Sequence, residues 1–245
     1  MSTQSSPWLS LVDTVTAEAP ELATRFRVRL DSGSAGGPRC LHIDIQATCE
    51  RLWSPHVDRN APIYQADALE IFLDPLGGGR IYRELEVAPT GAVFDAWIVN
   101  RTELSRSDTP RALHSIFPRL EAGSPRAEML VDGIAPNQLM RAALVDGMPA
   151  ARWTACLEIP ILPANSPSSL DGHDPSASGA IPELVAPEDW RLNVFRIQHR
   201  LPAGSGKAST PVLQAWQPTG RRDFHRPEAF ARLPLGAATE GLEPC

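Results

Sequence analysis

Three stretches near the middle of the chain alternate between hydrophobic and polar residues, and Gly- or Pro-rich segments separate them. The separators are Asp74–Gly79 and Pro89–Gly91, whose glycines permit a positive φ and whose prolines fix the φ of a turn. A period of two residues is that of a β-strand, in which successive side chains point to opposite faces. The pattern therefore predicts three consecutive antiparallel strands, at Ala68–Leu73, Ile81–Val87 and Ala92–Val99.

These strands combine a hydrophobic face with a face that carries acidic and aromatic side chains. The alternation places Leu69, Ile71, Leu73, Leu85 and Val87 on the hydrophobic face, with Phe94, Ala96 and Ile98 of the third strand. It places Glu70, Phe72, Tyr82, Glu84 and Glu86 on the other face, with Asp95 and Trp97 of the third strand. Two interpretations of this second face stay open: a sugar-binding surface, or a sheet face exposed to solvent.

Similar alternation recurs along the rest of the chain. Phe26–Leu30 and Leu41–Ala47 predict a β-hairpin, Arg191–Gln198 predicts a later strand, and Ala151–Ile159 predicts a strand that Pro160 ends. The 24 prolines disfavour an all-helical fold. About ten short strands with little helix indicate an all-β, antiparallel β-sandwich with immunoglobulin-like or jelly-roll-like layers.

We expect one domain over residues 1–245, with a core at about 22–236 and a flexible, Ser- and Pro-rich insertion at about 165–187. The net charge of -6 argues against a nucleic-acid surface, which needs clustered positive charge. No stretch is hydrophobic enough to span a membrane, and Met1–Leu11 lacks the pattern of a signal peptide. We therefore expect a cytoplasmic protein with neither nucleic-acid nor membrane partners.

Several sequence blocks, in order, resemble the carbohydrate-binding module family 9-like domains. The first has Pro62, Tyr64 and Asp67 followed by Glu70-Ile71-Phe72-Leu73-Asp74, and Tyr82-x-Glu84-Leu85-Glu86-Val87 and Gly91-x-Val93-x-Asp95 come after it. The C-terminal blocks run Trp190–Arg196, Ala215–Pro218 and Asp223–Phe230. The resemblance reaches from about residue 25 to about residue 236. It implies a non-catalytic protein that binds a mono- or oligosaccharide.

Members of this family hold a sugar between two aromatic rings, because the C–H faces of a pyranose pack on aromatic rings while its hydroxyls need polar partners. The resemblance implies that Tyr64 and Trp216 are the two rings, Glu70 a hydroxyl acceptor and Arg83 a donor. Founding members have tryptophan at the position of Tyr64, so the smaller ring makes a weaker platform here. Each ring is alternatively a packing residue.

Two other functions remain open. Glu70, Glu84, Glu86 and Asp95 include pairs that suit glycoside hydrolysis, which needs carboxyl groups roughly 5–10 Å apart. Alternatively these acids form ion pairs with Arg83, Arg101 or Arg196 and have no catalytic role. The other candidate function is that of a structural or interaction domain without a sugar ligand.

The sequence predicts no cofactor and no metal-site spacing. Calcium remains possible, because the family resemblance includes calcium-binding members. Asp67, Asp74 and Asp95 offer oxygen atoms of the kind that calcium prefers. Aspartates beside turns are more often turn formers.

Overall fold

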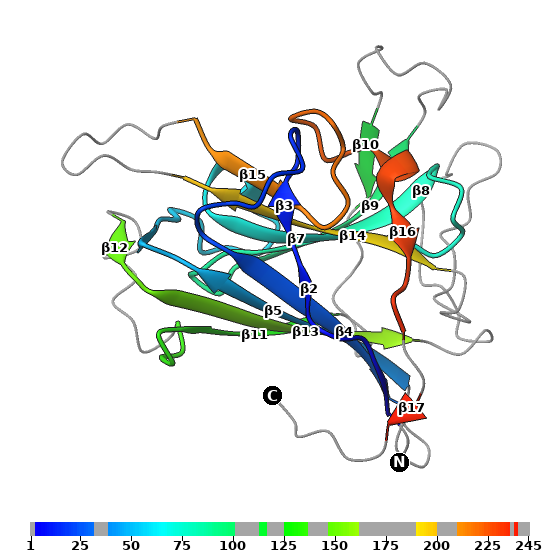
Figure 1. The fold of residues 1–245 in the computed structure, drawn as a ribbon, viewed down its shortest axis with the longest axis horizontal. Coiled ribbons are helices and arrows are strands. Elements are labelled where there is room, and N and C mark those ends of the chain that lie inside the picture. Colours follow the sequence, from blue (N-terminus) through cyan, green and yellow to red (C-terminus); the bar gives the residue numbers. More distant parts are fainter. Residues whose placement is uncertain are drawn as a thin grey trace.

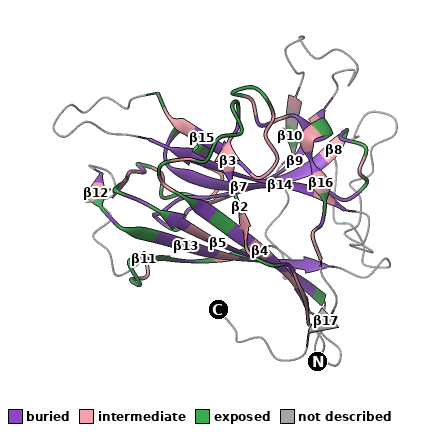
Figure 2. Cartoon of the chain, viewed as in Figure 1, coloured by how far each residue is buried: buried purple, intermediate pink, exposed green. Residues whose placement is uncertain are grey.

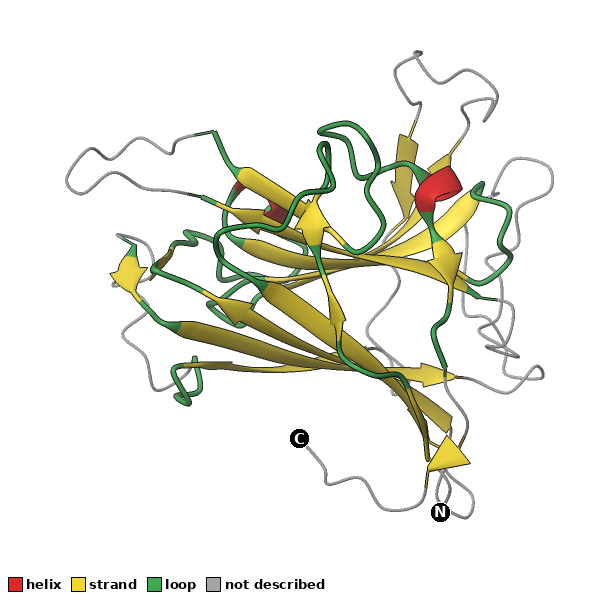
Figure 3. Cartoon of the chain, viewed as in Figure 1, coloured by secondary structure: helices red, strands yellow, loops and turns green. Residues whose placement is uncertain are grey.

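The computed structural model describes residues 3–31, 39–100, 113–116, 125–136, 147–161, 190–199, 210–235 and 238–239. Within these residues the chain is almost entirely strand and loop, and its helical segments are two short 3-10 turns, η1 (Ile63–Gln65) and η3 (Pro227–Ala229) (Figure 3). Most of the strands form two antiparallel sheets, one stacked on the other (Figure 1). This arrangement confirms the predicted all-β sandwich.

The lower sheet of Figure 1, called sheet A here, is built around the predicted N-terminal hairpin. Its strands run in the order β11 (Arg126–Val131), β13 (Arg152–Ile161), β5 (Arg39–Thr48), β4 (Thr24–Asp31), β1 (Thr3–Ser5) and β17 (Ala238–Thr239), and β2 (Leu9–Ser10) also pairs with β4. A separate two-stranded ribbon joins β6 (Arg51–Leu52) to β12 (Met148–Pro149).

The upper sheet, called sheet B, contains the predicted three-stranded meander at its centre. Its strands run in the order β10 (Leu113–Ile116), β9 (Val93–Asn100), β8 (Ile81–Val87), β7 (Ala68–Asp74), β14 (Arg191–Gln198), β15 (Val212–Ala215) and β3 (Val12–Asp13), and β16 (Ala231–Arg232) pairs with β14. The strand β14, far along the chain, thus lies beside β7 (Figure 1).

The predicted strand boundaries are mostly correct to within one or two residues, but the predicted stop at Pro160 is wrong. The strand β13 continues through Pro160, which lies opposite Cys40 of β5, and ends at Ile161. Its other neighbour, β11, begins at Arg126, opposite Glu158. Within the described residues the pairing of β13 with β11 does not reach Pro160, and a proline is tolerated at an unpaired edge. The predicted insertion at about 165–187 lies outside the described residues.

The register of sheet B corrects the predicted faces of β9. Glu84 lies opposite Ala96 and Glu86 opposite Phe94, whereas Asp95 lies opposite Leu85. Because residues paired across strands share a face, Phe94, Ala96 and Ile98 lie with the glutamates. Asp95 and Trp97 lie on the face that is turned toward sheet A. The sequence pattern assigned these faces wrongly, because the acidic residue of this strand, Asp95, points inward to its arginine partners.

The two sheets differ in how they are covered. Along β4 buried and partly exposed residues alternate, so one face of that strand meets solvent, whereas every residue of β7 is buried (Figure 2). The space between the sheets is filled by a large hydrophobic core that includes Trp153 and Trp190. A second hydrophobic cluster, with Phe72 and Phe195 of the strands and Phe224 and Phe230 of the C-terminal segment, lies on the opposite face of sheet B. The interpretation of this outer face as solvent-exposed is therefore wrong.

Candidate functional site: a pocket on the outer face of sheet B

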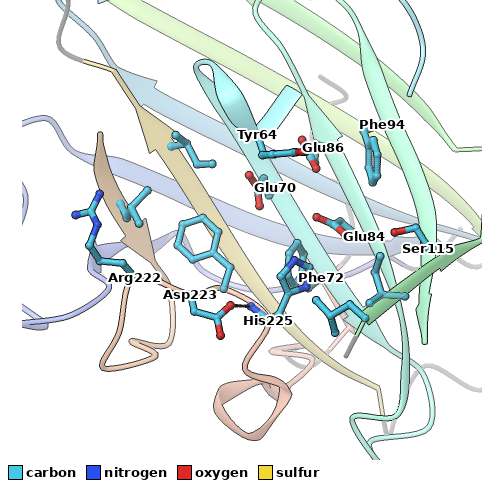
Figure 4. Close-up of a pocket in the computed structure, with 15 residues that line it drawn as sticks. Tyr64, Glu70, Phe72, Glu84, Glu86, Phe94, Ser115, Arg222, Asp223 and His225 are labelled. Atoms are coloured by element: carbon cyan, nitrogen blue, oxygen red, sulfur yellow. Dashed lines mark hydrogen bonds between the residues drawn. The ribbon is translucent and has the colours of Figure 1, made fainter. Parts of the chain in front are cut away.

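A pocket of about 360 Å³ opens on the outer face of sheet B, the face turned away from sheet A. Its floor comes from the central strands β7, β8 and β9, and its sides come from β10, β14, β15, η1 and the segment Arg222–His225 (Figure 4). The pocket combines aromatic and aliphatic walls with three glutamates, Glu70, Glu84 and Glu86. We call these three residues the glutamate cluster.

Strand register brings the glutamate cluster together. Glu70 of β7 lies directly opposite Glu86 of β8, and Glu84 lies two residues from Glu86 on the same face of β8. Side chains in these positions are immediate neighbours, with Cβ atoms about 4.5–5.5 Å apart across the pair. In Figure 4 the three side chains point into the same part of the pocket. Negative charges in these positions repel one another, so the state in which all three glutamates are ionised is unfavourable.

The glutamate cluster is deeply buried and poorly supplied with hydrogen-bond donors. The exposed fractions of Glu70, Glu84 and Glu86 are 2%, 6% and 0%. Glu70 Oε1 and both carboxyl oxygens of Glu86 are buried without a hydrogen-bond partner. Among the described residues, no arginine or lysine forms an ion pair with any of the three. A buried carboxylate without such partners is costly, and it reduces this cost by keeping its proton.

The pKa values follow from this burial. Burial, and secondarily the charge of Glu84, raises the pKa of Glu70 well above its ordinary value. Burial raises the pKa of Glu84 to about 7, although its contact with Glu86 acts in the opposite direction. Burial, followed by the charges of Glu70 and Glu84, raises the pKa of Glu86 to about 11. Burial therefore favours the protonated carboxyl groups of this cluster, and Glu86 keeps its proton at neutral pH.

Aromatic packing holds the C-terminal segment against the sheet beside the pocket. The rings of Phe195 and Phe224 stack with centroids 4.2 Å apart. The Tyr82 hydroxyl and His225 Nδ1 are hydrogen-bonded at 2.8 Å, and Phe72 packs against both rings. At the mouth, the exposed Arg222 donates to the carbonyl oxygen of Pro211 at 2.7 Å. These contacts fix one wall of the pocket.

Tyr64 provides an accessible aromatic ring at the pocket. It lies in η1, where Ile63 is completely buried in the second hydrophobic cluster, while Tyr64 itself is 51% exposed and lines the pocket. An exposed tyrosine of this kind offers an apolar ring face and a polar hydroxyl to a ligand.

Two of the four sequence-predicted site residues lie in this pocket, and two do not. Tyr64 and Glu70 line it. Arg83 lies on the inner face, where its guanidinium donates to both carboxyl oxygens of Asp95 at 2.9 and 3.1 Å. Trp216 packs against the inter-sheet core, with its ring 5.3 Å from that of Phe26. The prediction that Tyr64 and Trp216 enclose one sugar is therefore wrong, because sheet B lies between them.

One of the predicted ion pairs, that of Asp95 with Arg83, is present on the inner face. Asp95 is completely buried and accepts from Arg83 and, at 2.8 Å, from Arg59. Arg196 instead donates to Thr24 Oγ1 at 2.9 Å and to Cys49. Arg101 lies outside the described residues. Among the described residues, none of the three glutamates thus forms the predicted ion pair with an arginine.

The three candidate calcium ligands do not form a shared site. Asp67 accepts the backbone N–H groups of Trp53 and His199, both at 2.6 Å. Asp74 accepts those of Leu76, Gly77 and Gly79 in the turn between β7 and β8. Asp95 is bound by arginines. Among the described residues, no group of three or more His, Cys, Asp or Glu side chains is arranged to hold a metal ion.

Other pocket residues were not predicted as binding residues. The alternation of β8 pointed to Glu84 and Glu86, but as the carboxyl groups of an enzyme. Phe94 was assigned to the wrong face. The segment Arg222–His225 reaches the pocket only because β15 pairs with β14 and the chain then folds back over the sheet, and no local pattern in the sequence signals that contact.

Comparison with known proteins adds support for the fold. No protein-family model matches the chain, and no curated protein matches it. A solved structure from Bacteroides uniformis ATCC 8492, described as a "putative carbohydrate-binding protein", is similar to it with a TM-score of 0.50 and 14% sequence identity. The alignment covers 92% of this chain and 84% of that one.

Among the described residues, no helix has the length and hydrophobicity that a membrane span requires.

Proposed function

We propose that this protein binds a mono- or oligosaccharide, without catalysis, in the pocket on the outer face of sheet B. The observation that carries the proposal is the half-exposed ring of Tyr64 at a pocket whose floor holds three buried carboxyl groups. A pyranose presents an apolar face to such a ring and hydroxyl groups to such a floor. The similarity in fold to a protein described as carbohydrate-binding agrees with this proposal.

The chemistry of the pocket suits hydroxyl recognition. A protonated carboxyl group donates one hydrogen bond and accepts others, so it matches a hydroxyl group in both roles. Because Glu70 and Glu86 have buried oxygen atoms that lack partners, a ligand that supplies partners there gains more than it would from groups already paired. A site of this kind rejects ligands that leave the carboxyl groups unpaired.

The test is a thermal-shift panel of mono- and oligosaccharides, followed by calorimetric titration of any sugar that raises the melting temperature. We expect Tyr64→Ala to weaken binding by about 5-fold to 100-fold, as expected for loss of about 1–3 kcal/mol of stacking and packing. Trp216→Phe is the matched control, because it alters an aromatic ring on the inner side of sheet B. A panel without any response, or equal affinities for Tyr64→Ala and the unaltered protein, contradicts the proposal.

A second candidate function, hydrolysis of a glycoside, is favoured by one observation. The pKa values of Glu84 and Glu86, about 7 and about 11, are pushed apart, as in acid–base pairs of enzymes. However, Glu84 and Glu86 lie two residues apart on the same strand, whereas the two carboxyl groups of a glycosidase flank the scissile bond. Release of a chromophore from aryl glycosides, lost in Glu84→Gln, would favour the enzyme over the binding module.

A further inference from the structure

The glutamate cluster differs from the other buried acids of the protein in what its oxygen atoms contact. Asp44 accepts from Arg27 and Arg29, Asp95 accepts from two arginines, and Asp67 accepts two backbone N–H groups. Among the acids of the described residues, Glu70 and Glu86 line the pocket and also hold buried oxygen atoms without partners. Three hydrogen-bond acceptors thus belong to residues that line the pocket.

A positively charged ligand is more complementary to these carboxyl groups than a neutral ligand. Ionised carboxylates only accept hydrogen bonds, and a primary ammonium group only donates them, with three N–H groups and one positive charge. Charge-assisted hydrogen bonds of this kind are about twice as strong as neutral ones. A metal cation is a poorer match, because the acidic groups among the described residues do not converge on a metal position.

We propose that the sugar held in this pocket is an amino sugar with a free ammonium group, which donates to Glu70 and Glu86. This inference rests on the proposed function, because Tyr64 and the surrounding apolar walls provide the contact with the sugar ring. It specifies the class of ligand: an unacetylated amino sugar rather than a neutral or N-acetylated one.

Few other charged groups face the cluster. The elements around it contribute Tyr64 from η1 and Arg222, Asp223 and His225 from the C-terminal segment, whereas β14 and β15 contribute hydrophobic side chains. Asp223 accepts the backbone N–H of His225 at 3.0 Å (Figure 4). Arg222 lines the exposed mouth and is held by the carbonyl of Pro211. Among the described residues, the charges that act on Glu70 and Glu86 are those of the other glutamates of the cluster.

Proton release follows from this proposal. Burial raises the pKa values of Glu70, Glu84 and Glu86 and so favours their protonated forms before a ligand binds. An ammonium group stabilises the ionised carboxylates, so its binding expels at least one proton and strengthens as pH rises from about 5 to 7. A neutral sugar gains nothing from ionisation and binds without expelling a proton.

The experiment is calorimetric titration of the full chain near pH 6.5 with glucosamine, N-acetylglucosamine, glucose and cyclohexylamine, in two buffers of different ionisation enthalpy. We expect glucosamine to bind about 10-fold to 100-fold more tightly than glucose or N-acetylglucosamine, the range for hydrogen bonds to charged groups. Its apparent enthalpy changes with the buffer, which reports proton release. Glu70→Gln and Glu86→Gln reduce the preference to about 3-fold or less, within the uncertainty of neutral hydrogen bonds. Glu228→Gln, a partly exposed acid paired with Arg226, is the matched control and leaves the preference unchanged.

The outcomes separate this inference from the proposed function. Equal affinities for the three sugars overturn the amino-sugar inference and leave sugar binding standing. Binding of cyclohexylamine without any sugar overturns the proposed function, and the amino-sugar inference with it, while retaining a cation site. Absence of binding by all four compounds overturns both. A glucosamine preference that survives both Glu→Gln substitutions overturns the inference, because its source is then elsewhere.

Discussion

Sheet B buries acidic side chains on both of its faces, and the two faces differ in the partners that these acids have. On the inner face, Asp95 is completely buried between Arg83 and Arg59, so its charge has partners and its oxygen atoms have donors. On the outer face, Glu70 and Glu86 are equally buried but have oxygen atoms without partners. The two arrangements are separated by the thickness of one sheet.

This difference indicates different roles. An acid that pairs with two arginines has its charge and hydrogen bonds satisfied within the protein, and the pairing stabilises the fold. An acid that is buried without a partner lowers the free energy of unfolding. A ligand that supplies the missing hydrogen bonds offsets this cost. The following predictions use stability and binding to separate the two faces.

The largest expected effect is on the inner face. Asp95→Ala leaves the guanidinium of Arg83, which is 6% exposed, buried without its carboxylate. We expect a loss of about 3–5 kcal/mol in the free energy of unfolding, as for other broken buried ion pairs. Urea denaturation measures it. Arg59→Ala is the control and should cost far less, because Asp95 then keeps both bonds from Arg83; equal losses would refute the pairing described here.

Trp216 offers the next largest effect on the same side. Trp216→Ala removes a partly buried ring that packs against the inter-sheet core and Phe26. We expect a loss of about 2–3 kcal/mol, somewhat less than for a fully buried aromatic, with ligand affinity unchanged once the protein is folded. Trp216→Phe should retain most of the stability. Loss of sugar binding in a folded Trp216→Phe protein would show that this ring belongs to the site after all.

Glu86→Gln is expected to raise the free energy of unfolding, whereas the two substitutions above lower it. Burial raises the pKa of Glu86 from 4.5 to about 11, so the folded state keeps this proton after the unfolded chain has lost its own. Stability is therefore lost as pH rises from about 4.5 toward the folded pKa. The variant should be about 1–3 kcal/mol more stable than the unaltered protein at pH 8 and nearly equal to it near pH 4.5. Chemical denaturation at the two pH values measures this difference, and a destabilised variant at pH 8 would contradict the assignment.

Tyr64 gives the smallest effect on stability. Tyr64→Ala alters a side chain that is 51% exposed, and surface substitutions usually change stability by about 0.5 kcal/mol or less. A loss of sugar affinity without a change in the denaturation midpoint would assign Tyr64 to binding. A clear drop in stability would instead assign it to packing of η1 against the sheet.

Sequence reasoning predicted the local elements of this protein well. The strands β7, β8, β9 and β14 were identified because turn residues bound runs of strand-forming residues. The alternation of β8 also placed Glu84 and Glu86 on one face, since Leu85 between them and Val87 after them are hydrophobic. The same reasoning failed for β9, because its acidic residue, Asp95, lies on the inner face with its arginine partners, while the hydrophobic Phe94 and Ala96 lie on the outer face.

The sequence by itself determined the strands, the turns and the all-β class, because these depend on alternation and turn chemistry within a few neighbouring residues. Only the tertiary structure decided that Tyr64 and Trp216 lie on opposite sides of sheet B and that Arg83 pairs with Asp95. It alone decided that Glu70 and Glu86 have no arginine partner. Those facts depend on strand register and on the distant segment Phe224–Phe230 that covers the outer face. Register joins residues far apart in sequence, and a shift of one residue exchanges the two faces of a strand.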